Sequence, residues 1–202
     1  MATRILLISG STRAASTNTA ALRAMHEHAP SGVEPIWYDG LSALPAFSPD
    51  DADAPPPAVA ELRAAIDGAD AVLFCTPEYA GSLPGSLKNL LDWTVKGGEL
   101  YGKPVAYVSV AAEPRGAGAE ATLRTVLLYV GATILDDACV RVYIAHDAVG
   151  PDGRIADRPS IDRLVAAFGA VASASRAATG GVPAGAGAPR TVAGTADRAV
   201  TP

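Results

Sequence analysis

The feature that most constrains the fold is an apolar run near the N-terminus that leads into a turn rich in hydroxyl groups. Residues 5–8 read Ile-Leu-Leu-Ile, which is typical of a buried strand, and a helical pattern begins near residue 17. Backbone N–H groups at a helix start have no helical partner, and a guanidinium complements a phosphate dianion. The sequence therefore predicts a phosphate-binding turn, formed by Arg13 and by short polar side chains at Ser11, Thr12, Ser16, Thr17 and Asn18.

The spacing of this turn excludes two common phosphate-binding motifs. Neither the Gly-x-x-x-x-Gly-Lys-Ser/Thr pattern of a P-loop nor the Gly-x-Gly-x-x-Gly dinucleotide pattern follows the first strand, where Gly10 is the one glycine. With few glycines, hydroxyl groups must do more of the binding, which favours a single terminal phosphate such as that of FMN. The alternative is that these residues only cap the helix, although one of them would suffice for a cap.

Short apolar runs alternate with helical patterns along the chain, which predicts a parallel sheet with helices on both faces. The predicted strands lie near 4–9, 33–38, 70–76, 104–110 and 133–144, and the predicted helices near 17–29, 58–68, 84–96, 118–131 and 159–177. The expected fold class is α/β, a flavodoxin-like three-layer α/β/α sandwich with a five-stranded parallel sheet in order 2-1-3-4-5. One domain should span 1–177, and the Gly/Ala/Pro-rich tail 178–202 should be disordered.

In this fold, ligands bind beyond the carboxyl ends of the strands. The loop after the third predicted strand can present backbone N–H groups to a planar ring, and its candidate binding residues are Pro77, Glu78, Tyr79, Ala80 and Gly81. The loop at 111–118, which contains Glu113 and Arg115, could border the same ring or be a plain flexible loop. The acidic, proline-rich segment 39–57 could cover the site or form a subunit contact.

Composition and residue spacing narrow the function class. The net charge of −5 over 202 residues disfavours a nucleic-acid partner. Cys75 and Cys139 are isolated in apolar runs, as in buried cysteines of a reducing compartment, and His26, His28 and His146 lack metal-ligand spacing. No basic leader or bilayer-length apolar stretch is present, so we expect a cytoplasmic protein without a membrane partner. No Ser-His-Asp or Cys-His arrangement supports covalent catalysis.

Three segments carry a family resemblance, and these are GSTRAASTN, PEYAGSLPGSLKNLLDW and GKPVAYVSV. Together they resemble the NADPH-dependent FMN reductase family over about residues 4–145. The resemblance implies noncovalent FMN, with its phosphate at the residues of the first turn and its ring along Pro77 to Gly81. It also implies a homodimer or homotetramer, with Trp93 and segment 39–57 as contact candidates. Ala80 departs from the asparagine usual in the family, which removes a side-chain hydrogen bond worth about 0.5–1.5 kcal/mol.

The expected activity is therefore hydride transfer from NADPH or NADH to FMN, with electrons passed on to a small-molecule acceptor. FMN would carry the chemistry, so no catalytic side chain is predicted. Two alternatives remain open: a flavodoxin-like electron carrier, and a flavin-binding module without NAD(P)H activity of its own.

Overall fold

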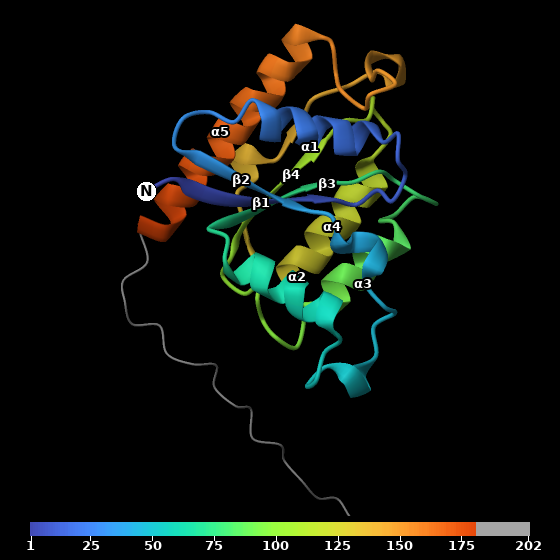
Figure 1. The fold of residues 1–202 in the computed structure, drawn as a ribbon, viewed down its shortest axis with the longest axis vertical. Coiled ribbons are helices and arrows are strands. Elements are labelled where there is room, and N and C mark those ends of the chain that lie inside the picture. The colour runs from blue at the N-terminus through green and yellow to red at the C-terminus, as the bar shows by residue number, and fades with distance from the viewer. Residues whose placement is uncertain (181–202) are drawn as a thin grey trace, which may run out of the picture.

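The computed structural model describes residues 1–180, which form a sheet with helices on both faces (Figure 1). The strands are β1 (Thr3–Ser9), β2 (Val33–Tyr38), β3 (Ala71–Cys75), β4 (Pro104–Ser109), β5 (Thr133–Ile134) and β6 (Val140–Arg141). Their order is β2-β1-β3-β4-β5, with β6 also paired to β4, and every pairing is parallel. The predicted α/β class and strand order are confirmed.

The helices are α1 (Thr17–Glu27), α2 (Pro57–Asp67), α3 (Gly85–Trp93), α4 (Ala117–Tyr129) and α5 (Arg158–Gly180). Successive residues of β1 point to opposite faces of the sheet, and residues 5–8 are 0% exposed on both faces. Ile5 and Leu7 pack in a core with α1 and α5, whereas Leu6 and Ile8 pack in a second core with α2, α3 and α4. Figure 1 shows these two helical layers on either side of the strands.

The strand predicted at 133–144 is interrupted in the structure. β5 ends at Ile134, a 3-10 turn covers Asp136–Ala138, and β6 resumes the pairing with β4 for two residues. The apolar residues on either side of the turn predicted one strand, but adjacent aspartates favour a turn over a ladder. Cys139 lies just after this turn, outside the strands, and its side chain is half-buried.

Segment 39–57 is anchored to α3. The Pro45 carbonyl accepts hydrogen bonds from Asn89 Nδ2 and Trp93 Nε1, both at 2.9 Å, and the Phe47 N–H donates to Asn89 Oδ1 at 2.8 Å. The rings of Phe47 and Trp93 meet edge to face at 5.0 Å. Trp93 is thereby 0% exposed, so its prediction as a subunit contact is wrong: its own chain covers the indole.

α5 continues to Gly180, three residues into the predicted tail, and 181–202 lie outside the described residues. Within the described part of the chain, no helix is both long enough and apolar enough to cross a bilayer. The register pairs Ser9 at the end of β1 with Cys75 at the end of β3. The turn that follows β1 and the loop that follows β3 therefore leave the same edge of the sheet.

Candidate functional site

A cavity of about 110 Å³ lies where these two connections meet. Its lining contains seven of the eleven predicted binding residues: Ser11, Arg13, Ser16, Thr17, Asn18, Pro77 and Tyr79. The predicted phosphate turn and the predicted ring loop thus share one cavity wall. Thr12, by contrast, is exposed and outside the lining.

Hydrogen bonds within the turn fix its shape. Ser16 caps α1 by accepting a hydrogen bond from the Thr19 N–H at 3.3 Å, and its carbonyl accepts from the Ala20 N–H. Ser9 Oγ lies 2.8 Å from Thr19 Oγ1 and accepts from the Ser11 N–H at 3.3 Å. Ser16 therefore caps α1, and Thr17 and Asn18, the first two residues of the helix, line the cavity.

A second cavity, of about 360 Å³, adjoins the first, because Thr17, Asn18 and Pro77 line both. The other lining residues come from the ends of β3, β4 and β6: Thr76, Glu78, Val110, Ala111, Ala112, Arg115, Gly116, Tyr143 and Ile144. Most of these present small, apolar or backbone groups. The two adjoining spaces suit a ligand with one phosphate and a flat, largely apolar ring system.

Two predicted binding residues, Ala80 and Gly81, line neither cavity. They form the tip of a two-residue turn in which Tyr79 and Ser82 exchange two backbone hydrogen bonds of 3.0 Å. Both tip residues have positive φ, 50° at Ala80 and 73° at Gly81, as in a type I′ turn. Glycine adopts this conformation without steric cost, whereas alanine is strained there.

An Ala80→Asn variant should therefore be more stable than the wild-type protein by about 0.5–1 kcal/mol, because asparagine tolerates the left-handed region. Urea unfolding would measure the difference. Ala60→Asn is the matched control, since Ala60 is exposed within α2, where the same change should destabilise by a few tenths of a kcal/mol. A loss of stability at both positions would contradict the type I′ assignment.

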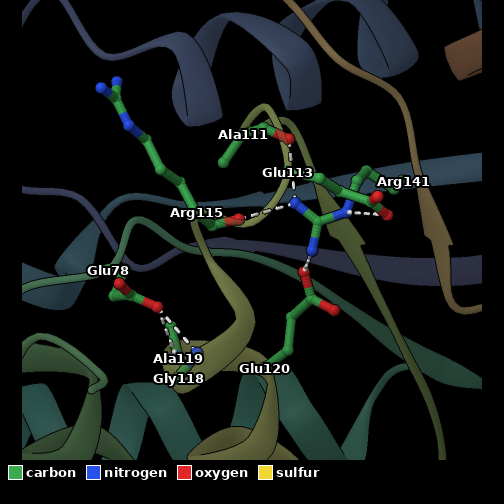
Figure 2. A network of polar contacts seen from close by, with 8 residues as sticks. All are labelled: Glu78, Ala111, Glu113, Arg115, Gly118, Ala119, Glu120 and Arg141. Carbon is green, nitrogen blue, oxygen red and sulfur yellow. Dashed lines mark hydrogen bonds and ion pairs between the residues drawn. The ribbon is translucent and has the colours of Figure 1, made fainter. Parts of the chain in front are cut away.

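Glu78 joins the loop after β3 to the start of α4. Its Oε2 accepts hydrogen bonds from the N–H groups of Gly118 at 2.7 Å and Ala119 at 3.2 Å (Figure 2). The N-cap residue of α4, Gly116, has no side chain, so Glu78 supplies the missing acceptor from another loop. Its carboxylate thus lies in the cavity wall but is held by the helix rather than left for a ligand.

The sequence interpretation missed Tyr143 and Ile144, which line the larger cavity from the chain just after β6. It treated 133–144 as one strand, so it placed no loop there. For loop 111–118 the sequence allows a wall of the ring site or a plain flexible loop, and the structure puts Ala111, Ala112, Arg115 and Gly116 in the cavity wall. Glu113 lies outside that lining.

Acid–base groups at the site are few. Cys75 is fully buried, and burial raises the pKa of its thiol far above the ordinary value, so it is a protonated donor to Asn18 Oδ1 at 3.4 Å. Cys75 and Cys139 are free cysteines. Among the described residues, no group of three or more His, Cys, Asp or Glu could hold a metal ion.

Comparisons with known proteins agree with this geometry. The family model for NADPH-dependent FMN reductase matches residues 3–147. An NAD(P)H-dependent FMN reductase of Pseudomonas aeruginosa is 37% identical over 158 residues, covering 76% of this chain and 85% of that protein. A quinone reductase of Pseudomonas putida is 34% identical over 188 residues, covering 86% and 96%.

Among solved structures, the flavoenzyme NAD(P)H:(acceptor) oxidoreductase FerB of Paracoccus denitrificans superimposes with a TM-score of 0.76 at 26% identity, covering 87% of this chain and 98% of that one. The family match, the two relatives above 30% identity and this superposition all indicate the same family of reductases. The chain belongs to the NADPH-dependent FMN reductase family.

Proposed function

We propose that this protein is an NAD(P)H-dependent FMN oxidoreductase that passes electrons to a small-molecule acceptor. One observation carries the proposal: the cavity at the turn after β1 adjoins the larger, mostly apolar cavity, and Thr17, Asn18 and Pro77 line both. FMN has one phosphate and one flat ring system, which matches this pair of spaces. Family membership and the activities of the relatives support the same assignment.

The residues present fit FMN. Arg13, the hydroxyls of Ser11, Ser16 and Thr17, and the helix start at Asn18 would hold the phosphate. Pro77, Glu78 and Tyr79 would lie along the ring, and the turn at Ala80 and Gly81 would keep that loop in place. When bound, FMN would supply the redox chemistry between pyridine nucleotide and acceptor. The chain would supply orientation and fixed backbone dipoles.

A quinone is the acceptor class that the cavity favours. Val110, Ala111, Ala112 and Ile144 give the cavity small apolar walls, and Tyr143, which is 51% exposed, offers an aromatic face at its edge. Such walls suit a flat, uncharged ring. The Pseudomonas putida relative is itself a quinone reductase.

We further propose that the protein is a homodimer or homotetramer and that it resides in the cytoplasm. The exposed aromatic rings of Tyr79 and Tyr143 at the cavities would be covered by a second subunit. The free cysteines suit a reducing compartment. Light scattering coupled to gel filtration would measure the assembly, and a monomeric mass at micromolar concentration would reject it.

The visible absorption spectrum tests the proposed activity. Protein incubated with FMN and desalted should retain the flavin spectrum, lose it on anaerobic addition of NADPH or NADH, and regain it when 1,4-benzoquinone is added. Flavin that is retained but stays oxidised with both nucleotides would instead indicate an electron carrier. Flavin that is lost on desalting would indicate an exchangeable flavin or a binding module.

A further inference from the structure

Arg115 is held at the wall of the larger cavity by its backbone. Its N–H donates to the Ala112 carbonyl at 2.8 Å, and its own carbonyl accepts from Arg141 Nη1 at 2.7 Å. The same Nη1 donates to the Ala111 carbonyl at 2.9 Å. Figure 2 shows the Arg141 guanidinium between these two carbonyls, closing loop 111–115. The main chain of Arg115 therefore has a fixed place at the cavity.

The carboxylates around this loop are already engaged. Glu120 pairs with Arg141 Nη2, and Glu113 lies 3.8 Å from Arg141 Nε. Glu78, the acidic residue of the cavity lining, accepts from the start of α4. Glu113 and Glu120 therefore pair with Arg141, and Glu78 caps α4.

The guanidinium of Arg115, unlike these carboxylates, has no oppositely charged partner in the described part of the chain. Figure 2 shows its side chain extending away from the Arg141 network. Within residues 1–180, no carboxylate forms an ion pair with it, whereas Arg4, Arg63, Arg124, Arg141, Arg154 and Arg158 have acidic partners. Arg23 and Arg163 also form no ion pair there, but they donate to carbonyl or hydroxyl oxygens. An unpaired guanidinium at a cavity edge, in a chain of net charge −5, is a local site for an anion.

The single phosphate of FMN does not need this residue. It has its own cavity at Arg13, and Arg115 is absent from that lining. The remaining anionic reactant is the pyridine nucleotide, whose nicotinamide must enter the ring cavity while its phosphates stay near the edge. A quinone carries no phosphate, so it offers no dianion for a guanidinium to bind.

We propose that Arg115 recognises a phosphate group of the reduced pyridine nucleotide and so helps to determine the specificity for the electron donor. This inference rests on the proposed function of the same site. The phosphate concerned belongs either to the 2′-position, which only NADPH carries, or to the pyrophosphate, which NADPH and NADH share. Arg115 would act on donor binding and not on the acceptor.

The test compares wild-type protein with Arg115→Ala, Arg115→Lys and the control Arg4→Ala. Arg4 is an exposed arginine at the opposite end of β1 from the site, and its removal changes the net charge equally. Calorimetric titration with NADP⁺ and NAD⁺ gives binding without turnover, and steady-state assays give KM for NADPH, NADH and 1,4-benzoquinone. We expect Arg115→Ala to raise the NADP⁺ Kd and the NADPH KM roughly tenfold, with partial recovery in Arg115→Lys. The quinone KM and the FMN affinity should stay within about twofold.

An effect confined to the phosphorylated nucleotides would assign the 2′-phosphate, and an equal effect on both pairs would assign the pyrophosphate. Donor constants unchanged in Arg115→Ala, or shifted equally in Arg4→Ala, would overturn the inference while leaving the reductase activity intact. A wild-type protein whose flavin neither nucleotide reduces would overturn the proposed function, and the inference with it.

Discussion

A Gly118→Ala variant should bind FMN at least tenfold more weakly than the wild-type protein. A Cβ at this position would lie 2.1 Å from the carbonyl oxygen of Gly81, 2.8 Å from its carbonyl carbon and 3.0 Å from Glu78 Oε2. The first two atoms are backbone and cannot swing aside, so turn 79–82 must move away from α4. That movement would also strain the hydrogen bond from the Gly118 N–H to Glu78. Overpacking of this kind typically costs about 1–3 kcal/mol of stability.

FMN affinity would be measured by titrating apoprotein against flavin fluorescence, with unfolding by urea run in parallel. Gly85→Ala is the matched control, because Gly85 lies in the first turn of α3 as Gly118 lies in the first turn of α4, yet a Cβ there meets no atom within 4 Å. The control should bind FMN normally and be no less stable. If Gly118→Ala also binds FMN normally, the loop after β3 is not a wall of the flavin site.

Arg13→Ala should weaken FMN binding by about ten- to a hundredfold while leaving the fold intact. A charged hydrogen bond to phosphate contributes about 1.5–3 kcal/mol, and 1.4 kcal/mol corresponds to a factor of ten. Arg13 is exposed and donates to the Ala15 carbonyl of its own turn at 2.9 Å, so its side chain supports no part of the core. The Arg13→Ala substitution should therefore lower the affinity for FMN and leave the urea concentration at the unfolding midpoint unchanged.

Riboflavin has the ring but not the phosphate, so the ratio of FMN affinity to riboflavin affinity measures the contribution of the phosphate alone. Wild-type protein should prefer FMN to riboflavin, and Arg13→Ala should lose most of that preference because only its FMN affinity falls. Arg158→Ala removes an equal charge at an exposed position outside both cavities and should keep the preference. An unaltered ratio in Arg13→Ala would mean that the phosphate binds elsewhere.

Much of the fold could be predicted because its determinants are local. Apolar runs such as Ile5–Ile8 specify strands buried on both faces, and the alternation with helices specifies parallel order. The turn between β1 and α1 could be predicted for the same reason, since a strand, a cluster of hydroxyls and a helix start are consecutive in the chain. The loop after β3 could be placed near it by the rule that parallel strands end at one edge.

The sequence by itself thus determined the strand order, the turn that bears Arg13 and the family. Only the tertiary structure decided that Trp93 is covered by its own chain and that Glu78 caps α4. It also brought Tyr143 to the cavity and left Arg115 unpaired beside Arg141. The physical reason is that these outcomes depend on contacts between residues far apart in the chain, and such contacts leave no periodic signal in the sequence.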